Sequence, residues 1–109
     1  MQFLVDGDVY RVVRITGPTH NMLGLKFVTG DEPNDLKLEP LSSDADVQGA
    51  TLRPDEIRHN VLEGVADANR TLGTNYRVGL IQFLPSDSPP VVVYRELARR
   101  LVERIVRGE

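Results

Sequence analysis

The first third of the chain shows the pattern of short β-strands joined by tight turns. The apolar stretch 3–5 is followed by Asp6-Gly7, a pair that favours the positive φ angles of a hairpin turn. Residues 9–15 are rich in the β-branched and aromatic side chains that strands prefer, and residues 23–27 alternate between apolar and other side chains. This pattern predicts three strands, with the third paired to the second.

The second predicted strand has apolar side chains on both of its faces. Val9, Val13 and Ile15 are odd-numbered positions on one face of the strand, while Tyr10 and Val12 are even-numbered positions on the other. Successive side chains of a strand point to opposite faces of a sheet, so we expect both faces of this strand to be covered or bound. The pattern therefore indicates a partner protein, or a second sheet, on the face that the helices leave open.

Residues 30–53 are the least regular part of the chain. They are rich in glycine, proline, serine and aspartate, with one short alternation at Leu36 and Leu38. A structureless connection of this length is unusual in a small domain, which leaves a flexible loop, an added edge strand and a functional segment as alternatives. The acidic residues lack the alternating spacing of a calcium-binding loop, which favours solvated loop charges over a metal site.

The segment that follows has the spacing of an amphipathic helix. Pro54 suits the first helical position, and Gly73 suits the stop. His59 falls opposite the apolar side, which predicts that it is exposed. Gly64 lies at the margin of the apolar side, where the lack of a side chain favours close packing of the helix on the sheet. The apolar positions recur every three or four residues: Ile57, Val61, Val65, Ala68 and Leu72.

The last part of the chain predicts one more strand and one more helix. Residues 76–84 carry apolar side chains at both odd and even positions, so both faces of the strand are apolar, as expected of an interior strand. The last helix is expected to begin at Pro90 or later, and the β-branched residues 91–93 are expected to be extended. Arginines and glutamates four apart occupy its polar side. Its apolar stripe has helical spacing: Tyr94, Leu97, Ala98, Leu101, Val102, Ile105 and Val106.

Together these elements predict a single α+β domain over residues 1–109, with a long polar loop at about 30–53. The predicted fold is a two-layer sandwich in the order βββ(β)αβα, in which two helices cover one face of the sheet. The sheet is expected to be mostly antiparallel, with about four to five strands. A ferredoxin-like sandwich is the alternative that the same pattern leaves open.

Residues 54–107 resemble the fourth domain of translation elongation factor G. The stretches that carry the resemblance are VLEGVADANRTLG, YRVGLIQFL and YRELARRLV, with Asp87-Ser88 in the loop before the last of them. The resemblance implies three strands followed by helix, strand and helix, with a left-handed crossover instead of the usual right-handed one. The histidine that this family carries before its last helix is replaced here by Pro89-Pro90. The resemblance therefore assigns no functional residue to this chain.

The composition narrows the classes of function. The net charge is −3, and the absence of cysteine excludes disulfide scaffolds, thiolate zinc sites and cysteine nucleophiles. The lack of cysteine also fits a reducing cytoplasm, and no apolar stretch approaches the ~20 residues of a membrane helix. We expect a cytoplasmic protein with no membrane partner. We expect no cofactor and no metal, because phosphate-binding glycine motifs and zinc-binding histidine motifs are absent.

Candidate chemistry is sparse, and it centres on the stretch GPTHN. His20 and Asn21 are predicted to lie in the loop that joins the second and third strands, as part of a binding tip. Ser86 and Asp87 lie in the loop PSDSPP, where they are a second candidate binding loop. With His20 they supply the residue types of a hydrolase triad, which leaves a small hydrolase-type enzyme as a second alternative.

The last helix carries the remaining candidates, Arg95 and Arg99. Cations on an exposed helix face are compatible with an RNA- or ribosome-associated role, which is the first alternative. The acidic balance of the chain argues against attraction to phosphate, so the leading hypothesis is a non-catalytic protein-interaction or self-associating module. The expected partner is another protein or a second copy of the chain. The candidate binding residues are His20, Asn21, Ser86, Asp87, Arg95 and Arg99.

Overall fold

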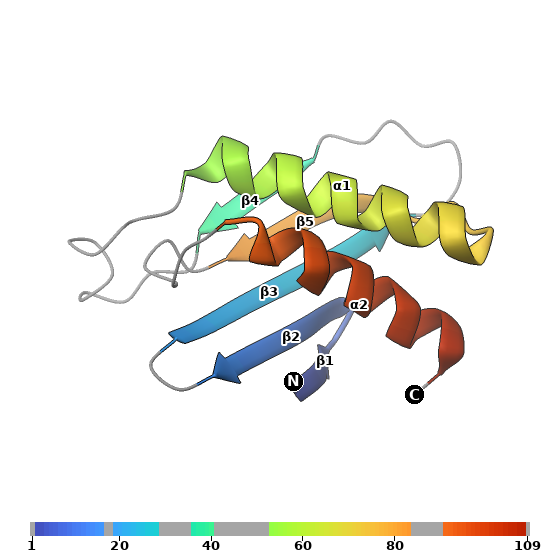
Figure 1. Cartoon of the computed structure of the whole chain (residues 1–109), viewed down its shortest axis with the longest axis horizontal. Helices are drawn as coiled ribbons and strands as arrows, with labels where there is room; N and C mark the ends of the chain where they lie inside the picture. The colour runs from blue at the N-terminus through green and yellow to red at the C-terminus, as the bar shows by residue number, and fades with distance from the viewer. Residues whose placement is uncertain (1, 17–18, 29–35, 41–52, 84–90, 109) are drawn as a thin grey trace.

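The fold is an α+β sandwich of one five-stranded sheet and two helices (Figure 1). The computed structural model describes residues 2–16, 19–28, 36–40, 53–83 and 91–108. The strands are β1 (Gln2–Asp6), β2 (Val9–Thr16), β3 (Thr19–Val28), β4 (Lys37–Pro40) and β5 (Arg77–Phe83). The helices are α1 (Pro54–Leu72) and α2 (Val93–Arg107). The predicted class and element order are confirmed, and β4 is the strand that the pattern left open.

The sheet has the strand order β1-β2-β3-β5-β4. β1, β2, β3 and β5 pair antiparallel in succession, which confirms the predicted pairing of the third strand with the second and the mostly antiparallel sheet. β4 pairs parallel to β5 at the edge. The β1–β2 hairpin turns at Gly7, whose φ of +63° is a conformation that glycine adopts without strain. In the predicted loop at 30–53, Leu38 lies in the edge strand β4, and residues 30–35 and 41–52 lie outside the described residues.

The connection from β4 through α1 to β5 has an unusual hand. Figure 1 shows β4 and β5 pointing the same way while α1 runs back in front of the sheet. With the helices toward the viewer, both strands point to the left and the chain steps down from β4 to β5 (Figure 1). This arrangement is a left-handed crossover, whereas roughly 98% of such connections are right-handed.

Helix α1 follows its predicted boundaries and buries its predicted stripe. It begins at Pro54 and ends at Gly73, which adopts the left-handed conformation at a φ of 68°. His59 is exposed, as predicted, and Leu72 is only partly buried. Gly64 is buried as expected, but it packs against α2 and not against the sheet. A Cβ there would stand 3.0 Å from the Cβ of Ala98 and would overlap the backbone carbonyl of Arg95.

Helix α2 begins earlier than the residue preferences indicate. Val91 and Val92 form a turn, with the Tyr94 N–H donating to the Val91 carbonyl oxygen at 3.0 Å, so the expected extended segment is wrong. Val91 and Val93 pack against the core, and this burial outweighs their weak helix propensity. Val106 is 40% exposed, so the predicted stripe does not stay buried through the last turn. No helix in the described ranges is long and apolar enough to span a membrane.

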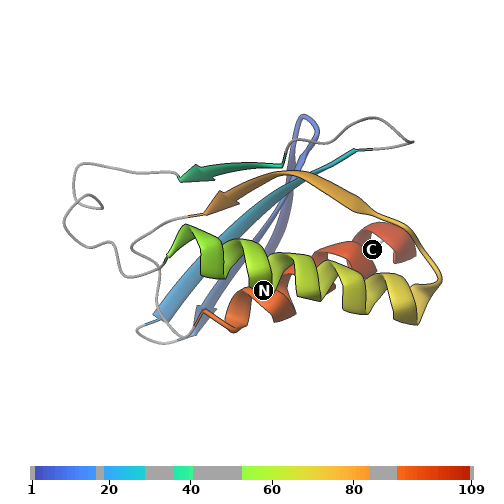
Figure 2. The same cartoon turned by 90° about the horizontal axis from the view of Figure 1, so that it is seen from above.

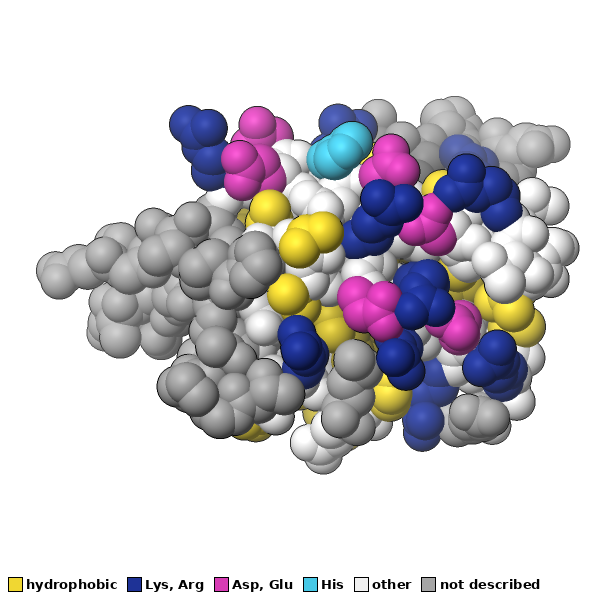
Figure 3. Space-filling model, viewed as in Figure 1, with side chains coloured by type: hydrophobic (Ala, Val, Ile, Leu, Met, Phe, Trp, Pro, Cys, Tyr) yellow, Lys and Arg dark blue, Asp and Glu magenta, His cyan; other side chains and the backbone are white. Residues whose placement is uncertain are grey.

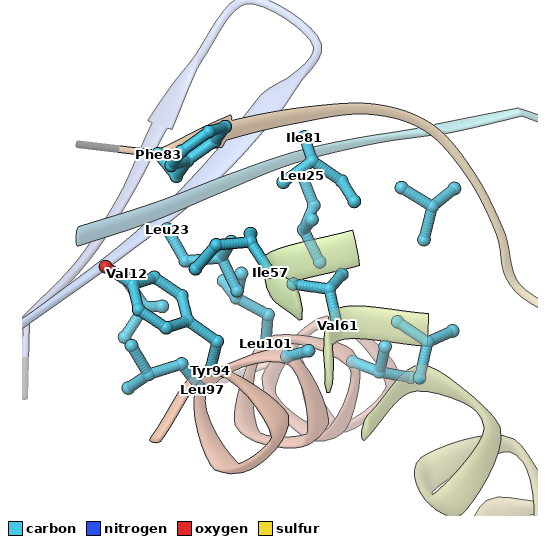
Figure 4. Packing of buried hydrophobic residues seen from close by; sticks show 14 of the residues in the cluster. Val12, Leu23, Leu25, Ile57, Val61, Ile81, Phe83, Tyr94, Leu97 and Leu101 are labelled. Carbon is cyan, nitrogen blue, oxygen red and sulfur yellow. The ribbon is translucent and has the colours of Figure 1, made fainter. Parts of the chain in front are cut away.

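The core lies between the helices and one face of the sheet (Figures 2 and 4). The sheet contributes alternate residues of its inner strands, and β5 is interior, as predicted. Among the described residues, Tyr94 is the largest fully buried side chain. The other fully buried large side chains are Phe83, Leu23, Leu25, Ile57, Ile81, Leu97, Leu101, Val12, Val61 and Val102. Both helices lie on one side, so no described element covers the opposite face of the sheet.

Candidate functional site

Figure 2 shows that one face of the sheet lies opposite the helices, and we call it the uncovered face. Alternate side chains of each strand point to this face. Leu23 and Leu25 of β3 are fully buried on the helix side. Because strand side chains alternate, Met22, Gly24 and Lys26 belong to the uncovered face. The strand pairing then places Arg11 of β2 on the same face, because its Cα is the partner of Gly24.

A row of polar side chains crosses this face. Arg11, Gly24, Gln82 and Glu39 are successive Cα partners on β2, β3, β5 and β4. Nη2 of Arg11 donates to Oε1 of Gln82 at 3.1 Å, and Nε2 of Gln82 donates to Oε1 of Glu39 at 3.3 Å. Nη1 of Arg11 donates to Oδ2 of Asp6 at 3.0 Å. We call Asp6, Arg11, Gln82 and Glu39 the polar row.

Gly24 makes the polar row geometrically possible. It is buried between Arg11 and Gln82, and Arg11 reaches across β3 at this point. A Cβ at this position would lie 3.0 Å from Oε1 of Gln82 and 3.3 Å from Cγ1 of Val9. A larger residue would therefore push the Gln82 amide away from the Arg11 guanidinium. The hydrogen bonds of the polar row therefore require the absence of a side chain at Gly24 as well as the side chains of Arg11 and Gln82.

Apolar side chains flank the polar row on the uncovered face. Leu4 is 46% exposed and Ile15 is 70% exposed. Val13, Met22 and Leu80 belong to the same face by strand alternation and are partly exposed. The expectation that β2 has apolar side chains on both faces is confirmed, and the described residues provide no second sheet to cover them.

A groove of about 310 Å³ lies where β1 meets the C-terminal half of α2. The guanidinium carbon of Arg104 stands 4.5 Å from the centre of the Phe3 ring, a cation–π distance. We call this the β1 groove, and its lining residues are Phe3, Leu4, Val5, Tyr10, Arg11, Leu101, Arg104, Ile105 and Gly108.

The structure corrects the predicted position of His20. It is the second residue of β3, with its Cα opposite Ile15, and does not lie in a loop. The ladder between β2 and β3 extends to the pair Thr16 and Thr19, so only two residues connect the strands. Asn21 is 3% exposed and lies on the helix side of the sheet, with Leu23 and Leu25. The two residues therefore lie in a strand and not in the predicted loop.

The loop candidates Ser86 and Asp87 lie outside the described residues. The hydrolase triad that combines them with His20 therefore has no described geometry. Among the residues that the structure describes, no group of three or more histidine, cysteine, aspartate or glutamate side chains is arranged to hold a metal ion.

Arg95 and Arg99 lie near each other on the outer surface of α2, but acidic side chains already neutralise them. Nε of Arg95 donates to Oδ2 of Asp67 at 2.7 Å, and Arg99 donates to Glu96 at 2.7 Å and to Glu103 at 2.8 Å. The hydrogen bond from Arg95 holds the pKa of Asp67 below its ordinary value.

The outer surface of the two helices therefore mixes both signs of charge. Glu96 also accepts a hydrogen bond from Arg100 at 2.8 Å, and Arg107 pairs with Glu103 at 3.6 Å, as the spacing of four predicted. Hydrogen bonds from Arg99 and Arg100 lower the pKa of Glu96. Figure 3 shows blue and magenta side chains interspersed over the helices. A surface of this kind has little attraction for a polyanion.

Comparisons with protein-family models, with curated proteins and with solved structures found no match.

Sequence reasoning missed the residues that organise the uncovered face. Arg11 shares the parity of Val13 in β2, and Gln82 is the polar residue of an otherwise apolar run in β5. These two polar residues within largely apolar strands were the signal in the sequence that could have identified the polar row. Their contact joins residues 71 positions apart, which local periodicity does not encode.

Proposed function

We propose that this protein is a non-catalytic protein-interaction module and that the uncovered face is its binding surface. The observation that carries the proposal is the exposure of Leu4 and Ile15, at 46% and 70%, on a sheet face that no described element covers. Antiparallel sheets with one solvated face normally present polar side chains on it. Apolar residues grouped around a fixed polar row are typical of a surface that another protein covers.

The polar row supports this proposal because it is held in place before a partner binds. Gln82 is 8% exposed, and its amide group joins Arg11 to Glu39 through hydrogen bonds. A partner therefore meets groups that are already ordered, and the cost of immobilising their side chains falls on folding instead of binding. Charged groups fixed among apolar ones favour one orientation of a partner over others.

A photo-crosslinking amino acid at position 15 tests the proposal in the cell of origin. We expect a discrete adduct with one protein chain from position 15 and none from position 58, because Arg58 is exposed on the helix side of the fold. Ile15→Asp should abolish an adduct formed from a second probe at position 13. Equal adduct patterns at positions 15 and 58, or none at 15, would contradict the proposal. Light scattering of the purified protein separates a partner from a second copy.

The RNA- or ribosome-associated alternative gains little support. Its candidates, Arg95 and Arg99, are paired with acidic side chains on the helix surface.

The left-handed crossover supports the proposal that the chain shares a fold with the fourth domain of elongation factor G. A shared fold carries no activity by itself, because function depends on the side chains at a site.

A further inference from the structure

The two edges of the sheet differ in how well they are protected. Edge strands expose unpaired backbone groups, and proteins usually block them with short length, lysine or proline. β4 has four residues and carries Lys37 and Pro40. β1 is longer and has neither lysine nor proline, and Leu4 and Val5 are 46% and 66% exposed. β1 is therefore the edge that is chemically open to another strand.

The hairpin geometry indicates which backbone groups face this open edge. β1 and β2 are joined by the two-residue turn Gly7-Asp8, and Asp6 is the Cα partner of Val9. In a two-residue hairpin the closing pair exchanges both backbone hydrogen bonds, and bonded and non-bonded pairs then alternate. The amides of Phe3 and Val5 consequently point away from β2, toward the free edge.

The groove beside this edge carries a cation that no described carboxylate compensates. Arg104 lines the β1 groove and stacks on Phe3, and no described acidic oxygen lies within the 4.0 Å ion-pair distance of its side chain. The nearby acids are already engaged: Asp6 pairs with Arg11 at 3.0 Å, and Glu103 pairs with Arg99 at 2.8 Å. An occupant of the groove that brings a carboxylate would complement this charge.

We propose that β1 binds an extended peptide segment of a partner protein as an added strand of the sheet. An apolar side chain of the peptide enters the β1 groove against Leu101 and Ile105, and an acidic side chain pairs with Arg104. Backbone hydrogen bonds to Phe3 and Val5 supply affinity that is independent of the peptide sequence. This site uses the strand edge and the groove, whereas the proposed function uses the uncovered face; Leu4 and Arg11 border both.

A second copy of the chain fits this edge less well. Pairing two β1 strands would bring two grooves together, each with its own Arg104. β1 offers no acid other than Asp6, which already pairs with Arg11. Like charges across an interface oppose association, so charge complementarity favours an acidic peptide.

The test uses two short synthetic peptides, valines flanked by glutamates and valines flanked by lysines, titrated into the full chain. We expect the glutamate peptide to bind and to slow amide exchange at Phe3 and Val5. Val5→Pro removes one outward N–H and should weaken binding about tenfold, the equivalent of one hydrogen bond. Arg104→Glu should reverse the preference between the peptides, whereas Arg58→Glu, a matched change of charge on α1, should not.

Three outcomes would overturn the proposal. The first is equal binding of both peptides. The second is an absence of added protection from amide exchange at Phe3 and Val5 in the unmodified chain. This second readout does not require any variant to fold. The third is a dimer of the protein alone that Val5→Pro converts to a monomer, because the occupant would then be a second copy. The crosslink from position 15 is unaffected by Val5→Pro under this proposal, so failure here and failure of the uncovered face are distinguishable.

Discussion

The two faces of the sheet differ in the side chains that they carry and in how deeply those side chains are buried. On the helix side, Leu23, Leu25 and Phe83 are fully buried in an apolar core (Figure 4). On the uncovered face, Arg11 and Gln82 form a hydrogen-bonded row while Ile15 remains 70% exposed. The comparison indicates that burial on the helix side provides most of the stability of the fold, whereas the uncovered face keeps apolar side chains in solvent. Substitutions at matched positions measure this difference.

The largest expected difference is between two leucines on opposite faces. Leu25→Ala removes a fully buried side chain and leaves a cavity, so the free energy of unfolding should fall by about 2–5 kcal/mol. Leu4→Ala truncates a side chain that is 46% exposed, and the loss should stay below about 1 kcal/mol. Urea unfolding of both variants measures the difference. Equal losses would mean that the uncovered face also contributes core stability.

A second prediction concerns the contact between the helices that cover the sheet. Gly64→Ala places a Cβ against the Arg95 carbonyl and 3.0 Å from the Cβ of Ala98, which forces α1 and α2 apart. We expect a loss of about 1–3 kcal/mol from overpacking. Helix propensity alone predicts a gain of about 1 kcal/mol, so the sign of the change in thermal unfolding decides between the two effects. A stabilised variant would contradict the close packing of the helices.

The polar row should contribute less to the free energy of unfolding than the core does. Gln82→Met keeps the size of the side chain and removes its hydrogen bonds to Arg11 and Glu39, with an expected loss of about 1–2 kcal/mol. A double-mutant cycle with Glu39→Gln isolates the part that the Gln82–Glu39 bond carries. If Gln82→Met were as costly as Leu25→Ala, the contrast between the faces would fail.

The smallest expected effect lies on the outer surface of the helices. Because the pKa of Asp67 is lowered by Arg95 and then by Arg70, its carboxylate stabilises the fold above its unfolded pKa of ~3.9. That contribution is lost as the pH falls through the lower folded pKa. Asp67→Asn should therefore be less stable than the original chain at neutral pH, and the two should converge in acid. A difference that persists below the folded pKa would assign the effect to packing.

Local pattern predicted the elements because helix and strand periodicities are short-range properties. The spacing of Ile57, Val61 and Val65 places three apolar side chains on one side of α1 whatever the rest of the chain does. Pro54 and Gly73 mark the helix ends for equally local reasons. The same arguments predicted the β1–β2–β3 arrangement and the cover of one face by both helices.

Predictions of single sites were weaker because they depend on register and on tertiary neighbours. His20 was expected in a loop, yet pairing with β2 draws it into β3. Arg95 and Arg99 were expected to be available for binding, yet Asp67, 28 residues from Arg95, neutralises one of them from the neighbouring helix. Neither a turn-forming sequence nor a basic helix face shows which distant residues will contact it in the folded protein.

The sequence by itself determined the presence of both helices and of four of the five strands, and it determined which side of each helix is apolar. Tertiary structure decided that β5 inserts between β3 and β4, that Gly64 meets Arg95, and that Arg11 reaches Gln82 across Gly24. The physical reason is the range of the interactions. Periodicity acts within one element, whereas strand order, helix approach and side-chain pairing are settled when separate elements bury their apolar sides together.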